Sequence, residues 1–406
     1  RKRPASPAQL AGYTAWQHDD EIDFDYHVRR IILPRPGEVL NLLRYVSLNH
    51  GALLDRSRPM WEVHIIEGLA DGRLALYSKI HHSLADGVTA LRMLQRTMTS
   101  DPDDRNGTAF WDASLTRRRK RAPAPQQSLL GKVTGAVGKV AGTVEQVAGL
   151  APVGLKVVTE GLFNKDFVAP LQQAPQTILN VPIGSARRFA AQDWPTERLR
   201  AVAARHGISF NEVLIAMSAS ALRAYLLDQK ALPDDSLNVC IPVSLHSADD
   251  RDGNALTAII ISMATSTASP RERLAQIHAS SSSAKNVVRG MRPIQAMALG
   301  AANVWSLAFA PLPGFVNHTP RGFNLMISSV PGPEEPQYWN GARLDGCYPV
   351  SIPMEGLAMN ITITTVGGKA NFGIIGARAQ LPSLQRILDH LENALVELED
   401  IEPLDG

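Results

Sequence analysis

The clearest candidate for chemistry in this sequence is the segment His81-His82-Ser83-Leu84-Ala85-Asp86-Gly87. A neutral imidazole can remove a hydroxyl proton near neutral pH, and a positioned base of this kind accelerates a reaction by about 100- to 10,000-fold. Asp86 can orient the site or hold the turn through an ion pair. We expect Gly87 to permit a backbone geometry that a side chain forbids, or a close approach to the next helix. The segment therefore predicts general-base catalysis, with His82 as the base.

Three other interpretations of the segment compete with this one. A His-His pair at the end of a strand is more often a hydrogen-bonded structural feature than a base. A metal site is disfavoured, because adjacent strand residues diverge and His81, His82 and Asp86 do not simply converge on one ion. Serine hydrolysis is disfavoured because the sequence contains no Gly-x-Ser-x-Gly elbow that would expose a nucleophile.

The residues around the segment predict a strand-to-helix turn. A first strand shows alternating apolar positions, at Trp61, Val63 and Ile65. After turn signals, a second strand places on one face the residues Leu74, Leu76, Ser78, Ile80 and His82. Helical spacing then joins Val88, Leu91, Leu94 and Met98. This pattern predicts that His82 points with the apolar set and that His81 points to the opposite face.

Length and composition set the class of the protein. The chain has 406 residues, 45% hydrophobic and 20% charged, which suits a globular protein of about two domains. No run approaches the roughly 18 apolar residues needed to cross a bilayer. With 41 basic and 39 acidic side chains, the net charge of +2 gives no general attraction for nucleic acid.

Only two cysteines are present, Cys240 and Cys347, which is too few for a disulfide framework and lacks the spacing of a zinc site. The residues 1–9 carry charge but no apolar stretch of the signal-peptide type. We therefore expect a cytoplasmic protein. Because the chain does not begin with Met, we also expect a processed or truncated form.

Composition divides the chain into three parts. An N-terminal domain, residues 1–115, carries the histidine segment. A connecting part, residues 116–185, contains a basic run at 117–121 and a valine stripe at Val133, Val137, Val140, Val144 and Val147. The stripe predicts a partly helical connection. A second α/β domain occupies residues 186–406.

The second domain contains well-marked elements. A helix is expected from Pro195 to Arg205, closed by Gly207. The next helix starts at a capping box formed by Ser209 and Glu212. Strands are expected over 238–245, 256–267 and 323–330, and a hairpin turning at Gly367-Gly368 joins 360–366 to 371–375. An amphipathic helix starting near Leu384 ends the chain.

The pattern His-His-x-x-x-Asp-Gly is shared by coenzyme A-dependent acyltransferases and peptide condensation domains. The chain resembles the bacterial bifunctional wax ester synthase/acyl-CoA:diacylglycerol acyltransferases over nearly its full length. The supporting segments are 54–69, 79–87, Asn211-Glu212, 328–333 and 338–372. The chain departs from the family pattern at Met60, where Leu is usual, at Glu212, where Asp is usual, and at Ser329, where Asn is usual.

The resemblance implies an α/β fold of two chloramphenicol-acetyltransferase-like, coenzyme A-dependent acyltransferase domains packed as a pseudodimer. A tunnel between them would admit both substrates, and the first domain would lack its N-terminal part. The implied catalytic residues are His82 and Asp86, supported by His81, Gly87 and Asn211. The implied reaction transfers a long-chain acyl group from acyl-CoA, the co-substrate, to a fatty alcohol or diacylglycerol. No permanently bound cofactor and no metal are implied.

Several alternatives stay open. Asn211 fits a helix start better than a direct catalytic role, because Ser209 to Val213 already reads as a capping sequence. The function has two alternatives, a condensation or polyketide-associated acyltransferase that uses a carrier protein, and a non-catalytic lipid-surface protein. The basic run and valine stripe fit docking at the inner membrane or at lipid inclusions as well as they fit a solvated linker and interdomain helix. The sequence leaves the oligomeric state open.

Overall fold

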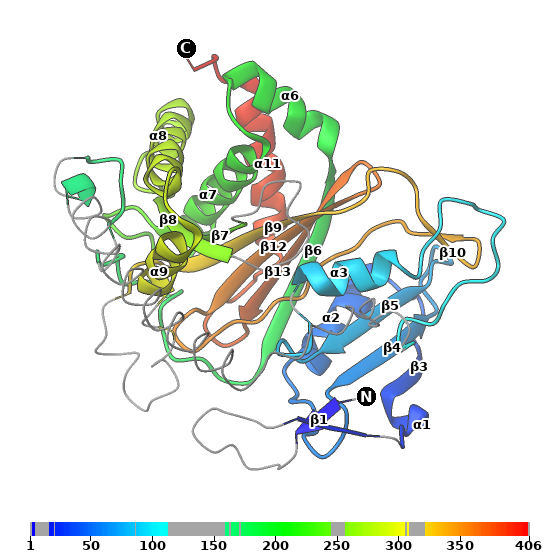
Figure 1. Ribbon diagram of the computed structural model, residues 1–406. Helices are drawn as coiled ribbons and strands as arrows, with labels where there is room; N and C mark the ends of the chain where they lie inside the picture. Colours follow the sequence, from blue (N-terminus) through cyan, green and yellow to red (C-terminus); the bar gives the residue numbers. More distant parts are fainter. Residues whose placement is uncertain are drawn as a thin grey trace, which may run out of the picture.

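The computed structural model describes most of the chain. The described residues are 2–4, 16–19, 21–85, 87–112, 159–161, 164–169, 172–244, 256–304, 307 and 321–404. The basic run at 117–121, the valine stripe and Asp86 lie outside them. The described part is a mixed α/β structure built on two main sheets (Figure 1).

The smaller of the two main sheets contains both strands of the predicted hairpin. It has the order β3-β4-β5, formed by Val28–Ile32, Trp61–Glu67 and Ala75–Ile80. β3 runs parallel to β4, and β4 runs antiparallel to β5. The nearby helices are α1 (Phe24–His27), α2 (Val39–His50) and α3 (Gly87–Gln95). A short ribbon of β1 (Lys2–Pro4) and β2 (Trp16–His18) precedes them.

The larger sheet has six strands in the order β6-β13-β12-β9-β7-β8. Their bounds are Arg187–Pro195 for β6, Asn238–Ser244 for β7, Leu256–Ser262 for β8, Leu325–Pro331 for β9, Met359–Val366 for β12 and Lys369–Ala377 for β13. β9 lies parallel to both β12 and β7, whereas the remaining pairs are antiparallel.

Helices cover the larger sheet and form the main apolar core with it (Figure 1). They are α6 (Thr196–His206), α7 (Phe210–Asp228), α8 (Pro270–Val288), α9 (Pro293–Val304) and α11 (Arg386–Asp400). The centre of this core is α7, whose side chains from Val213 to Leu222 are buried almost without interruption. A helix that is apolar all round is expected where neighbours surround it on every side.

The two sheets meet where α2 packs on β6. Alternate residues of a strand face opposite layers, and Ala190 therefore joins the main core while Phe189 packs with α2 in a second cluster. Residues 344–353 also lie at this contact. The carbonyl oxygen of Pro349 would be 1.8 Å from a Cβ at position 373, which explains why a glycine occupies that position in β13.

A segment of the C-terminal half reaches the small-sheet region. The two-stranded ribbon of β10 (Tyr338–Trp339) and β11 (Ala342–Arg343) pairs through Tyr338 with Thr99. Further along, Asp345 binds Arg73 at 2.5 Å. The end of the β4–β5 hairpin is therefore packed against residues more than 250 positions later in the sequence.

The expected elements of the second region are present with small shifts of their ends. The capping box of Ser209 and Glu212 is confirmed, as are the hairpin at Gly367-Gly368 and the helix closed by Gly207 in the left-handed conformation. The predicted strand over 256–267 is shorter, because β8 ends at Ser262 and a turn follows. The predicted helix after the histidine segment is also present as α3.

Candidate active site

The histidine segment begins where the β4–β5 ladder ends. Ile80, the last residue of β5, pairs with Trp61 across the hairpin. The backbone N–H of His81 then donates to the Met60 carbonyl at 3.0 Å, which is the final cross-strand hydrogen bond. The chain leaves the extended conformation at this point, and residues 82–84 form a turn.

His81 holds this turn with its own ring. Its Nδ1 accepts from the Ser83 N–H at 3.3 Å and lies 2.7 Å from Ser83 Oγ, while the Leu84 N–H donates to the His81 carbonyl at 2.8 Å. An Nδ1 that accepts leaves the ring proton on Nε2. Burial, with smaller effects from Arg56 and His82, lowers the pKa of His81. His81 is therefore a neutral, turn-forming residue near neutral pH.

The structure corrects the expected orientation of His82. We predicted that His82 would share a buried apolar face with Leu76, Ser78 and Ile80, but β5 ends before it, and its side chain is exposed in the turn. The predicted face is also the less buried one, because Ser78 is exposed and Leu74 lies outside the strand. The buried member of β5 is Tyr77, which faces α2 through the second core cluster.

The structure places two more of the residues predicted for the site, Gly87 and Asn211, at the starts of two helices. Gly87 begins α3, and neither expected reason for a glycine applies among the described residues: its φ is not left-handed, and no atom lies within 4 Å of a Cβ built there. Asn211 lies exposed in the first turn of α7, in the helical layer of the larger sheet. Its place in this turn agrees with a helix-start role.

Glu212, beside Asn211, does more than cap its helix. Its carboxylate is buried, accepts from Ser209 N at 2.7 Å and binds Lys285 of α8 at 3.1 Å. Burial alone would raise the pKa of Glu212, but hydrogen bonds from Ser209 and Ser281 together with Lys285 bring it to about 2. Glu212 thus ties the start of α7 to α8.

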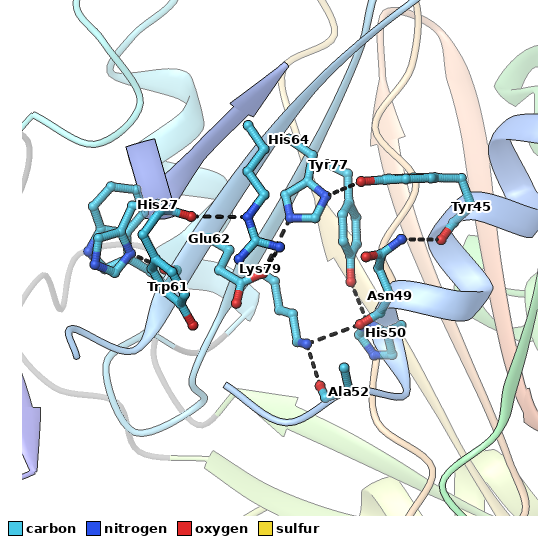
Figure 2. A network of polar contacts seen from close by, with 12 residues as sticks. His27, Tyr45, Asn49, His50, Ala52, Trp61, Glu62, His64, Tyr77 and Lys79 are labelled. Atoms are coloured by element: carbon cyan, nitrogen blue, oxygen red, sulfur yellow. Dashed lines mark hydrogen bonds and ion pairs between the residues drawn. The ribbon is translucent and has the colours of Figure 1, made fainter. Parts of the chain in front are cut away.

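A buried polar layer that we did not predict from the sequence lies between α2 and the β4–β5 hairpin (Figure 2). We use this name for the side chains Tyr45, His50, Glu62, His64, Tyr77 and Lys79. His64 is 0% exposed and Glu62 is 7% exposed, so the layer lies inside the protein. Buried polar groups of this kind are tolerated only when hydrogen bonds satisfy them.

One chain of contacts in the polar layer runs through His64. Because a carboxylate only accepts, His64 Nε2 donates to Glu62 Oε2, at 3.3 Å, and Nδ1 lies 2.7 Å from the Tyr45 hydroxyl. Arg29 lies 3.7 Å from the same Glu62 oxygen. The hydrogen bond from His64, helped by the charges of Arg29 and Lys79, lowers the pKa of Glu62 against the opposing effect of burial.

A second chain of contacts runs through His50 and reaches the C-terminal half. His50 Nε2 donates to the Ser351 carbonyl at 2.9 Å, and this leaves Nδ1 to accept from the Tyr77 hydroxyl at 3.0 Å. Burial, aided by the positive charges of Lys79 and Arg187, lowers the pKa of His50 to about 4. His50 is therefore neutral and fixed in one tautomer.

A sequence signal for the polar layer does exist. Polar or aromatic side chains recur every second residue on both strands, at Glu62 and His64 and at Tyr77 and Lys79. The register pairs His64 with Tyr77 and Glu62 with Lys79. Alternation alone cannot show which face is buried, and the apolar set was the natural but wrong choice.

The described residues contain no group of three or more histidine, cysteine, aspartate or glutamate side chains that could hold a metal ion. No helix within the described ranges is long and apolar enough to cross a membrane.

Comparison with known proteins gives the family. The model of the wax ester synthase/diacylglycerol acyltransferase catalytic domain matches residues 1–214, and the model of the corresponding C-terminal domain matches residues 252–399. The chain belongs to the wax ester synthase/diacylglycerol acyltransferase family. It is therefore an acyltransferase, and the predicted family and enzyme class are confirmed.

Named members of the family are similar along most of the chain. A probable diacylglycerol O-acyltransferase of Mycobacterium tuberculosis (strain ATCC 25618 / H37Rv) is 44% identical over 404 residues, which is 98% of this chain and 86% of the relative. An O-acyltransferase of Acinetobacter baylyi is 35% identical over 391 residues, or 95% and 83% of the two chains.

A solved structure of a wax ester synthase/diacylglycerol acyltransferase, from Marinobacter aquaeolei VT8, is 37% identical. It superposes with a TM-score of 0.74 and covers 98% of this chain and 85% of its own. The predicted α/β acyltransferase fold is thereby confirmed. The carrier-protein alternative is not favoured, because the family models and the relatives agree on the wax ester synthase/diacylglycerol acyltransferase family.

Proposed function

We propose that this member of the wax ester synthase/diacylglycerol acyltransferase family transfers a long-chain fatty acyl group from acyl-CoA to a lipid alcohol, with His82 as the general base. The acceptor is a fatty alcohol or a diacylglycerol, and the product is a wax ester or a triacylglycerol. The observation that carries the proposal is the exposed imidazole of His82 in a turn fixed by its neighbour, inside the region that matches the catalytic domain.

The proposed reaction needs only one base. His82 removes the proton of the alcohol, and the alkoxide oxygen attacks the carbonyl carbon of the thioester. A C–O bond forms, the resulting tetrahedral intermediate collapses, and the C–S bond breaks. The coenzyme A thiolate leaves and takes the proton back from the imidazolium of His82. No acyl-enzyme is formed, so no nucleophilic side chain is required.

The neighbours of His82 support the turn in this proposal. His81 is already engaged with Ser83, which makes it a poor candidate for the base and a good one for shaping the loop. Asp86 is assigned the role of holding the segment before α3, and Gly87 starts that helix. Asn211 keeps a supporting role at the start of α7.

We further propose the domain limits 1–115 and 186–406 for two acyltransferase-like domains, with 116–185 as the connection. The basic run at 117–121 gives the connecting part five positive charges in succession, so we propose weak attachment to the anionic surface of the inner membrane or of lipid inclusions. Such attachment would bring the enzyme to its water-insoluble acceptors.

The decisive experiment measures thiol release from palmitoyl-CoA with a panel of linear alcohols and diacylglycerols. We expect His82→Ala to lower kcat by about 100- to 10,000-fold, the usual contribution of a general base, and to leave thermal unfolding unchanged. The matched control is His390→Ala. This variant removes a histidine of the C-terminal helix α11, where His390 binds Asp228 of α7. Full turnover by His82→Ala would overturn the mechanism, and thiol release without ester formation would overturn the transfer reaction.

A further inference from the structure

Lys79 lies near the end of β5, two residues before His81. Its side chain is half-buried in the polar layer, and its amine donates to two backbone carbonyls, one in the last turn of α2 and one two residues after the helix (Figure 2). The acceptors are the Asn49 carbonyl, at 3.1 Å, and the Ala52 carbonyl. Lys79 therefore joins the last turn of α2 to the last residues of β5.

The chemistry of a helix end explains this contact. The final carbonyls of a helix have no partner within the helix, and they form the negative end of its dipole. A lysine amine satisfies them with both hydrogen bonds and charge. Burial lowers the pKa of Lys79, whereas the carboxylate of Glu62, its partner across the β4–β5 register, acts in the opposite direction.

The contact matters because β5 is an edge strand of the described small sheet. Backbone hydrogen bonds hold it to β4 on one side only, and the last of these is made by His81. Lys79 supplies a second attachment, perpendicular to the ladder, immediately before the histidine turn. Without it, the two carbonyls would lose their charged donor, and β5 would lose its side-chain contact nearest to the histidine turn.

A neighbouring contact extends the attachment to the C-terminal half. Tyr77, on the same face of β5 as Lys79, binds His50 at the end of α2, and His50 binds the Ser351 carbonyl. The end of α2 therefore contacts β5 through two side chains, Tyr77 and Lys79. Through His50 it also binds the segment 344–353.

We propose that Lys79 is a positioning residue for acyl transfer, because it fastens the end of β5, and with it the His81-His82 turn, to the C-terminal end of α2. The proposal rests on the proposed function, since it concerns the placement of His82. A shift of about 1 Å in a catalytic group can lower the rate by about 100-fold. We therefore expect kcat to depend on the contact of Lys79 with the end of α2.

The test compares three variants with the wild-type enzyme in the thiol-release assay. Lys79→Met keeps the unbranched apolar chain and removes the donors, and we expect kcat to fall by about 10- to 100-fold with KM for palmitoyl-CoA changed less than about twofold. Lys79→Arg keeps the charge and donors, and it should recover most of kcat. Lys369→Met is the control, because it removes ion pairs to Asp193 and Asp345 without touching the β5 end of the hairpin.

Two readouts separate positioning from general stability. Melting temperature and kcat per folded molecule are measured for every variant, and the proposal requires kcat to fall when the folded fraction does not. Should Lys79→Met not fold, Lys79→Gln replaces it, with the expected order of kcat being wild type, Arg, Gln. Equal kcat values per folded molecule overturn the proposal. Wild-type turnover that is lost in His82→Ala establishes the proposed function separately, so a failure at Lys79 alone is recognisable.

Discussion

The two main sheets of this acyltransferase are stabilised in different ways. The larger sheet and its helices enclose a continuous apolar core in which Trp194, Leu222 and Phe372 are at most 1% exposed. The smaller sheet packs on α2 through an interior that includes Glu62, His64 and Tyr77. The first region has an apolar core throughout, whereas the second combines a small apolar cluster with buried side chains that are paired by hydrogen bonds.

This difference follows from the physics of the two kinds of interaction. Apolar burial is favourable at about 25 cal/mol per Å² and does not depend on direction. A buried hydrogen bond adds only about 1 kcal/mol net, but it requires one geometry and costs more when one partner is removed. The polar layer therefore contributes little net stability, but it strongly restricts the position and orientation of β5. The histidine turn follows directly from this strand.

Removing an apolar side chain from the larger region should have the largest effect on stability. Phe372 lies edge-on to Trp194, with ring centroids 5.0 Å apart. We expect Phe372→Ala to lower the free energy of unfolding by about 4 kcal/mol, measured by urea denaturation. The control is Phe24→Ala, whose side chain is 48% exposed and whose loss should cost less than about 0.5 kcal/mol. Equal losses in the two variants would contradict the apolar-core assignment.

Acidic pH should lower the stability of the small-sheet region through protonation of His50. Its pKa is about 4 in the folded protein and near 6.5 when unfolded, so the unfolded chain binds more protons between these values. This contribution to stability is complete above pH 6.5 and is lost as the pH falls towards 4. We expect the free energy of unfolding to drop by about 2 kcal/mol from pH 7 to pH 5 through this group, at about 1.4 kcal/mol per pKa unit.

The variant His50→Gln isolates this contribution. An amide can still donate to the Ser351 carbonyl, but it does not titrate, so the variant should show a correspondingly weaker dependence on pH. Urea denaturation of both proteins at pH 5, 6 and 7 provides the comparison. Parallel curves for wild type and variant would show that His50 does not contribute as we expect.

The smallest of these effects concerns a polar feature of the larger region. Glu62 and Glu212 are the buried carboxylates of the described chain, one in each region. Ser209→Ala removes the hydroxyl that both caps α7 and binds Glu212, and we expect a loss of about 1 kcal/mol in unfolding free energy. Ser269→Ala removes the cap of α8, where Glu272 is exposed, and should cost about 0.5 kcal/mol. A larger loss at Ser269 would contradict the role given to the buried carboxylate.

Local signals allowed much of the larger region to be predicted. The capping box at Ser209, the helix stop at Gly207 and the Gly367-Gly368 hairpin each depend on residues a few positions apart. The strand-turn-helix around the histidine segment was predicted for the same reason. These features need only short-range backbone and side-chain chemistry, which the sequence displays directly.

The orientation of the site was harder to predict. Alternation in the β4–β5 hairpin correctly indicated strands, but the buried face was assigned to Leu76 and Ile80 instead of Tyr77. The error arose because buried side chains were assumed to be apolar. His64 and Tyr77 are buried because partners from α2 satisfy them, and those partners lie 19 and 27 positions away in the sequence. The buried Glu62 is satisfied in turn by His64.

The sequence by itself determined that the His81 to Gly87 segment lies at the end of a strand, in a protein of the wax ester synthase/diacylglycerol acyltransferase family. The pattern and its spacing are local, and the resemblance extends along the chain. Only the tertiary structure decided that His82 is exposed, that His81 holds the turn, and that Lys79 joins β5 to α2. These contacts depend on which helix covers which face of a sheet, and that choice follows from the packing of the whole molecule.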